Sequence, residues 1–267
     1  LISVPFSLLI AGAELSGNTA MASQLSVWLY DNVMLLSFLS GLFTIAVILA
    51  FYLIRRKKLS EALWLRPLPA PTLLTGATLA PAFYLVVTVV LASLPHAWQE
   101  NYSDAVAHLD TGGLWAFLAI VVAAPLVEEF IFRGLVLTRL TRAMPGWLAV
   151  LLSAAVFGAL HSHPIQFAYA FALGCFFGAM DLRTNSIWPS ILAHFVFNLI
   201  GQIFSALPDE GADFLLLAVL GVLLLLAIIL PILNHSAIAA LFRRKPAAPP
   251  PPPPPAPGQY DFDPWDS

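Results

Sequence analysis

Seven apolar stretches constrain the fold of this chain more than any other feature of its sequence. They span residues 33–54, 73–94, 114–137, 147–161, 165–180, 187–204 and 214–233. A helix needs about 20 apolar residues to cross the hydrocarbon core of a bilayer, where every backbone polar group must pair within the protein. The pattern therefore predicts an all-α membrane helix bundle with about seven transmembrane helices. The short fourth and fifth stretches indicate tilt, or helices that end inside the protein.

The composition agrees with a membrane protein. Of the residues, 60% are hydrophobic and 10% are charged, whereas about a quarter of an ordinary soluble domain is charged. The formal net charge of -3 provides no basic field for nucleic acid, and the chain contains no nucleic-acid-binding motif. The lipid bilayer is therefore the expected partner, and the cell membrane the expected location. Cys175 is the single cysteine, which excludes an intramolecular disulfide.

Basic residues predict the orientation of the bundle. If the N-terminus lies outside and the helices alternate, every lysine and arginine except Arg133 falls in an inside segment. The positive-inside rule then places the C-terminus inside. The expected parts are an N-terminal segment without an assigned function (1–32), two helices with their loops (33–113), a core with the polar motifs (114–204), the last helix with a basic end (205–245) and a Pro-rich tail (246–267).

The two ends of the chain carry less information. The chain begins with Leu1, and Met21 is an alternative start residue. The prolines of the tail favour extended polyproline II structure and disorder. An inert, solvated tail is the default interpretation, and a ligand for a proline-recognition domain is the alternative.

The third apolar stretch contains two adjacent glutamates in EEFIFRG. Ionisable residues are costly at membrane depth and mark a candidate functional site. Glu129 and Arg133 are four residues apart with the acid first, which favours an ion pair on one helix face. Glu128 points about 100° away on the same helix, so it remains free to take a proton from water as a general base. A buried ion pair that only fixes helix packing is the alternative.

Two further motifs place histidines in the fourth and sixth stretches. His161 ends the motif FGALH, and His194 and Asn198 belong to HFVFN, where the spacing of four puts both on one helix face. Two carboxylates, two imidazoles and one carboxamide held away from bulk water indicate hydrolysis by an activated water. The carboxamide can donate to a developing oxyanion. Polar residues that only join helices are the alternative. We expect Glu128, His161, His194 and Asn198 to converge on one polar cavity.

Three other residues predict packing around this site. Gly174 and Gly178 form GxxxG, a pattern typical of close helix approach. Pro125 has no N–H, so it frees a backbone carbonyl and predicts a kink beside the glutamates. In straight, alternating helices Glu128 and His161 would differ by about 10 Å in depth. Tilt, the kink or a re-entrant fourth stretch must then bring them together.

The motifs EEFIFRG, FGALH and HFVFN, in this order, resemble the CAAX protease and bacteriocin-processing family (CPBP, also called Abi), which includes the type II CAAX prenyl proteases. The resemblance covers about residues 114–204. It implies an intramembrane endopeptidase that acts on a peptide or protein. No cofactor is expected. The implied roles are water activation by Glu128 and His161, oxyanion binding by His194 and Asn198, and support by Glu129 and Arg133.

Two alternatives remain open. Glu128, His161 and His194 would also provide three ligands for zinc with an open fourth position, although the chain contains no HExxH. Intramembrane Glu and His residues also build proton relays, so a proton-coupled transporter or a non-enzymatic membrane scaffold is the second alternative. Transport predicts an internal repeat, and the two halves of the sequence show no convincing self-similarity.

Overall fold

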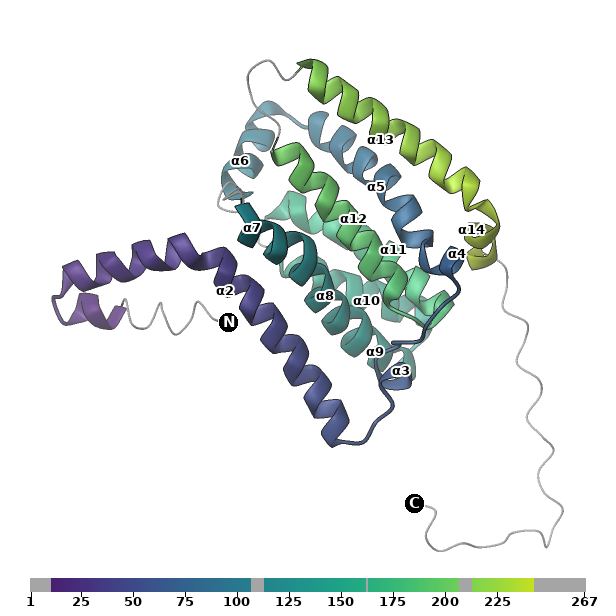
Figure 1. Ribbon diagram of the computed structural model, residues 1–267, viewed down its shortest axis with the longest axis horizontal. Coiled ribbons are helices and arrows are strands. Elements are labelled where there is room, and N and C mark those ends of the chain that lie inside the picture. Colours follow the sequence, from purple (N-terminus) through teal and green to yellow (C-terminus); the bar gives the residue numbers. More distant parts are fainter. Residues whose placement is uncertain (1–10, 107–112, 162, 207–212, 243–267) are drawn as a thin grey trace, which may run out of the picture.

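The computed structural model describes residues 11–106, 113–161, 163–206 and 213–242, and within these ranges the chain forms helices and no strand (Figure 1). The all-α prediction is therefore confirmed for the described residues. The helices are α2 (Thr19–Ile54), α3 (Leu59–Ala62), α4 (Ala70–Leu73), α5 (Thr75–Ala92), α6 (His96–Val106), α7 (Gly113–Ala116), η2 (Phe117–Ala123), α8 (Ala124–Glu129), η3 (Phe130–Leu137), α9 (Thr138–Ala143), α10 (Gly146–Ala159), α11 (Pro164–Thr184), α12 (Trp188–Ser205), α13 (Asp213–Leu233) and α14 (His235–Phe242). The elements from α7 to α9 follow one another without a break, and we call this run the motif helix.

Within the described residues, four helical runs are long and apolar enough to cross a membrane, which indicates a membrane protein. They are Thr19–Ile54, Ala70–Ala92, Gly113–Ala143 and Pro164–Thr184. Gly146–Ala159 and Ala218–Leu233 are shorter apolar helices. A helix is present at each of the seven predicted stretches. The count of seven crossings and the orientation of the termini stay predictions.

The first long helix begins earlier than the apolar pattern indicates. α2 begins at Thr19 rather than near Val33, because the Asn18 side chain caps it by accepting a hydrogen bond from the Met21 N–H at 3.1 Å. The predicted stretch was chosen for about 20 consecutive apolar residues. It therefore begins after polar residues such as Asp31 and leaves out the first part of α2. The N-terminal half of α2 extends beyond the other helices (Figure 1).

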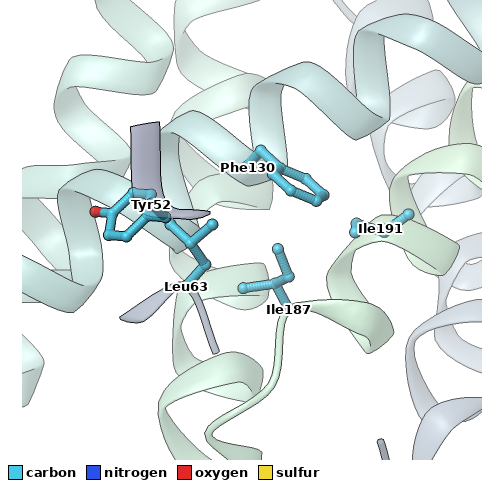
Figure 2. Packing of buried hydrophobic residues seen from close by; sticks show 5 residues of the cluster. All are labelled: Tyr52, Leu63, Phe130, Ile187 and Ile191. Carbon is cyan, nitrogen blue, oxygen red and sulfur yellow. The ribbon is translucent and has the colours of Figure 1, made fainter. Parts of the chain in front are cut away.

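A buried apolar cluster attaches the C-terminal end of α2 to the bundle (Figure 2). It consists of Tyr52, Leu63, Phe130, Ile187 and Ile191, which come from α2, the end of α3, η3 and the start of α12. The Ile187 N–H also donates to the Trp64 carbonyl oxygen at 3.0 Å. The cluster therefore fixes three segments that are far apart in sequence, and one of them continues directly from the two glutamates.

Small residues allow the remaining helices to lie close together. A Cβ on Gly174 would lie 2.9 Å from the Ala154 Cβ, and one on Gly178 would lie 3.2 Å from Val150. These contacts join α11 to α10 and confirm the close approach predicted from GxxxG. α5 lies against α12 in the same way at Gly76, where an added Cβ would overlap the Pro189 carbonyl oxygen.

Replacing Gly76 by alanine should destabilise the protein, because the obstructing Pro189 oxygen belongs to the backbone and cannot rotate away. Overpacking costs about 1–3 kcal/mol, and alanine recovers roughly 0.5–1 kcal/mol of helix propensity. We expect an apparent Tm in detergent that is about 5 °C lower. The matched control is Gly221→Ala in α13, whose added Cβ has no atom within 4 Å. A Tm no lower for Gly76→Ala than for this control would contradict the tight contact.

Candidate active site

The motif helix departs from α geometry on both sides of the glutamates. α8 carries Glu128 and Glu129 between the two π-helical segments η2 and η3, a feature frequent at functional sites. The Ala124 N–H donates to the Ala119 carbonyl, five residues earlier. The next donor in this pattern would be Pro125, which has no N–H, so the Ile120 carbonyl lacks a donor from the helix.

Asn198 supplies the missing donor. Its Nδ2 donates to the Ile120 carbonyl oxygen at 2.8 Å, which joins α12 to the motif helix. This contact uses one of the two amide hydrogens that the sequence analysis assigned to an oxyanion. The prediction that Pro125 frees a carbonyl is consistent with this contact, while the group that pairs with the carbonyl was not predicted.

Glu129 has no exposed surface and contacts two partners. The Nε of Arg133 lies 3.0 Å from its Oε2, which is the predicted i,i+4 ion pair. Its Oε1 lies 2.9 Å from the Nδ1 of His194. Because an ionised carboxylate only accepts hydrogen bonds, Nδ1 carries the proton in this contact. Glu129 on α8 therefore orients the imidazole ring of His194 on α12.

The other nitrogen of His194 faces the second glutamate. Nε2 lies 3.7 Å from Oε2 of Glu128, and the side chains of His194 and Glu128 are 9% and 30% exposed. The His194 ring thus lies between one buried carboxyl group and one accessible carboxyl group. The family resemblance pairs Glu128 with His161 for water activation. In the structure, the imidazole ring that lies next to Glu128 is that of His194.

His161 lies beside this pair, with one aromatic ring between it and His194. Its Nδ1 is 2.9 Å from the Phe157 carbonyl oxygen. The Phe157 ring centroid lies 4.9 Å from the His161 ring and 6.1 Å from the His194 ring. The Phe157 ring therefore lies near both imidazoles.

Arg133 is almost completely buried, and aromatic rings form much of its surroundings. Its Cζ lies 4.6 Å from the centroid of Phe157 and 5.5 Å from that of Phe177. Within the described residues its Nη1 and Nη2 have no hydrogen-bond partner. Cation–π attraction is stronger in such a desolvated position than at a surface. The two aromatic rings and the Glu129 carboxylate therefore stabilise the buried positive charge of the guanidinium.

A buried aspartate that the sequence motifs do not include lies on α11. Asp181 has no exposed surface, and its Oδ2 accepts a hydrogen bond from the Ser190 hydroxyl at 2.7 Å. A signal was present in the sequence, because an acid directly follows the apolar run of α11. The predicted stretch ends at residue 180 and so leaves Asp181 outside the membrane core.

A cavity of about 400 Å³ lies between α2 and the motif helix. Its lining is mainly apolar and includes the hydroxyl groups of Ser37, Ser40 and Thr44. Glu128 lines it, whereas His161, His194 and Asn198 do not. Of the four, only Glu128 reaches this cavity, and the convergence of all four on one polar cavity stays a prediction.

The two walls of this cavity meet at a glycine of α2. An added Cβ on Gly41 would lie 3.1 Å from the Val127 Cγ2 and 3.2 Å from the Ala123 Cβ. Val127 directly precedes Glu128 in the chain. α2 therefore contacts the motif helix directly beside Glu128, the candidate site residue that lines the cavity.

The candidate zinc ligands do not form a recognisable metal site. Within the described ranges, no three His, Cys, Asp or Glu side chains are grouped so that they could hold a metal ion. Nδ1 of His194 is engaged by Glu129, which leaves Nε2 as the nitrogen available to a ligand. The zinc alternative is therefore tested by measuring the metal content of the purified protein.

These features define a helical membrane protein with a buried Glu, His and Arg centre that reaches a cavity through one carboxyl group. Residues 110–200 match the family model described as "Type II CAAX prenyl endopeptidase Rce1-like", which confirms the resemblance carried by the three motifs. The chain is also 31% identical over 77 residues to a protein of Bacillus subtilis (strain 168) named "Putative membrane peptidase YdiL". This match covers 29% of the chain and 32% of the relative, so the chain spans about a third of the length of the curated relative it matches. No solved structure shows a significant match.

Proposed function

We propose that the chain is an intramembrane endopeptidase of the CAAX-protease type, a multi-pass protein of the cell membrane that hydrolyses a peptide bond with an activated water. The observation that carries the proposal is the position of His194 between Glu129 and Glu128. A group that can exchange protons is thereby held next to a carboxyl group that lines a cavity. The match of residues 110–200 supports the reaction class.

Glu128 is the general base in this proposal. It takes a proton from a water, the water oxygen attacks the carbonyl carbon of the substrate, and the proton passes to the nitrogen of the leaving amine. His161 assists the water, as the family resemblance implies. Glu129 and Arg133 act indirectly, because Glu129 fixes the His194 ring and Arg133 balances the charge of Glu129.

His194 and Asn198 are the proposed donors to the oxyanion that develops on the substrate carbonyl oxygen. His194 donates from Nε2 when both of its ring nitrogens carry a proton. Asn198 retains one amide hydrogen beside the one that it gives to Ile120. The roles of these residues in the reaction and in packing therefore need to be separated by experiment.

The cavity beside Glu128 is the proposed place of the substrate. Its mainly apolar lining, with three hydroxyl groups from α2, suits an extended segment of a membrane-associated peptide or protein. A prenylated peptide and an unmodified apolar peptide both fit this description. Cleavage of each class therefore has to be measured.

The proposal is tested with purified protein in lipid nanodiscs and a mixture of prenylated and unmodified peptides. Cleavage in ¹⁸O water should add one ¹⁸O to the new carboxyl group, as detected by mass spectrometry. Activity that survives chelators supports the Glu-based mechanism, whereas inhibition reversed by zinc, with stoichiometric bound metal, supports the zinc form. Failure to cleave any peptide, together with proton flux in proteoliposomes, would contradict the proposal and favour a transporter.

Replacing Asn198 by alanine should lower stability as well as activity, because the partly buried Ile120 carbonyl loses its donor. An unpaired polar group costs about 1–3 kcal/mol, which predicts an apparent Tm lower by several degrees. If Asn198 also binds the oxyanion, kcat should fall on the order of 10²-fold with little change in KM.

Pro125→Ala provides the matched test of this double role. It restores a main-chain N–H that can reach the Ile120 carbonyl in the same helical pattern. The Asn198→Ala, Pro125→Ala double variant should therefore regain Tm but not kcat. A double variant that regains both would show that Asn198 acts only in packing.

A further inference from the structure

A second cavity, separate from the one at Glu128, lies at the C-terminal end of α2. It has a volume of about 430 Å³ and lies between the end of α2, α3 and α9. Five cationic side chains and one carboxylate line it: Arg55, Lys57, Lys58, Arg139, Arg142 and Glu61. The carboxylate is already engaged, because Lys58 Nζ lies 3.8 Å from Glu61 Oε1. Within the described residues, the lining holds no second carboxylate to balance the remaining positive charges.

Two hydrogen bonds hold Arg139 in place on the α9 side of this cavity. Tyr52 belongs to the buried cluster of Figure 2, where its hydroxyl points away from the other members of the cluster, and it accepts a hydrogen bond from Arg139. Arg139 also donates from Nη1 to the Leu135 carbonyl at 2.8 Å. Arg142, three residues further along α9, lines the same cavity. Two like charges thus face one cavity, an arrangement that a bound anion stabilises.

The opposite wall belongs to the end of a helix that could span a membrane. Arg55 lies over Phe51, with its Cζ 5.5 Å from the ring centroid. Phe51, Leu53 and Ile54 are 51%, 62% and 80% exposed, so the turn next to the cations presents apolar surface outward. An anion with apolar chains would match both features, whereas a free phosphate would use only the charges. Basic pockets between membrane helices bind anionic headgroups for this reason.

We propose that this cavity binds the phosphate-bearing headgroup of an anionic phospholipid, with the acyl chains along the exposed end of α2. Arg139 and Arg142 contact the phosphate from α9, while Arg55 and Lys57 contact it from the α2 side. Arg139 and Arg142 lie about 17 and 21 Å along the motif helix from Glu128, at about 1.5 Å per residue. Lipid binding is therefore separable from the reaction at the glutamates.

The test is native mass spectrometry of the full chain, purified and then exposed to equal amounts of phosphatidylglycerol and phosphatidylcholine. The wild type should retain phosphatidylglycerol preferentially. The Arg139→Gln, Arg142→Gln variant should retain it about tenfold less, since each cation near an anionic headgroup contributes to affinity. The Arg55→Gln, Lys57→Gln variant should show a similar loss. It removes only exposed side chains, so it keeps the test valid if loss of the Arg139 contact to Tyr52 impairs folding.

The matched control is Arg66→Gln, Arg183→Gln, which removes two exposed cations that do not line the cavity. This variant should retain phosphatidylglycerol like the wild type. An equal loss in the control, or no loss in either cavity variant, would overturn the proposal. Complete displacement of phosphatidylglycerol by inorganic phosphate at equal concentration would also overturn it, because the apolar chains would then contribute nothing.

Discussion

Replacement of Glu128 by glutamine should lower kcat by on the order of 10²–10⁴-fold, the contribution typical of a general base. Glutamine nearly preserves the size and shape of the side chain but cannot accept the proton of the attacking water. Glu128 is partly exposed to a cavity, so the change leaves no fully buried charge unpaired. We therefore expect KM and apparent Tm to stay close to those of the wild type, measured with one cleaved peptide in nanodiscs.

The matched control for this variant is Glu100→Gln. It makes the same chemical change on α6, where the Glu100 side chain is 65% exposed. Neither kcat nor Tm should change in the control. A kcat equal to that of the wild type in Glu128→Gln would remove the general base from the mechanism. A large fall in Tm would instead assign Glu128 to packing.

Removal of Arg133 should destabilise the protein more than any other single change proposed above. Arg133→Met keeps much of the side-chain volume between Phe157 and Phe177 but leaves the buried Glu129 carboxylate without its cation. Breaking a buried ion pair in this way costs about 3–5 kcal/mol. For a chain of this size the apparent Tm in detergent should fall by about 10 °C.

A second variant distinguishes the loss of charge from the loss of packing. In Glu129→Gln, Arg133→Met both members of the ion pair are neutral, so the uncompensated charge on Glu129 is absent. This double variant should be more stable than Arg133→Met alone, because removing both partners costs less than removing one. If the double variant were the less stable of the two, packing of the guanidinium rather than its charge would explain the role of Arg133. Its activity should stay low, since the Glu129 carboxylate no longer orients His194.

The helices and the first ion pair could be predicted because both depend on neighbours in the sequence. Apolar stretches bounded by polar residues predicted positions at which the described residues form helices, and a spacing of four residues predicted the contact of Glu129 with Arg133. The start of α2 at Thr19 could not be read in this way. It depends on the cap at Asn18 and on polar helical residues, which a search for apolar length excludes.

The contacts that assemble the candidate site depend on the packing of distant segments. His194 and Glu129 are 65 residues apart in the chain, and Asn198 and Ile120 are 78 residues apart. Spacing within one helix shows that a side chain is polar and which face it occupies. It does not show which of two adjacent glutamates a histidine will contact, nor that a carboxamide will pair with a carbonyl freed by a proline.

The glycine at position 41 links the width of the substrate cavity to a residue that takes no part in the chemistry. Because a side chain there would press on Val127 and Ala123, it would move α2 outward along the edge of the cavity. In the proposed endopeptidase, single exchanges on α2 would thus change the girth of the segment that the cavity admits. The proposed reacting groups on the neighbouring helices would keep their positions.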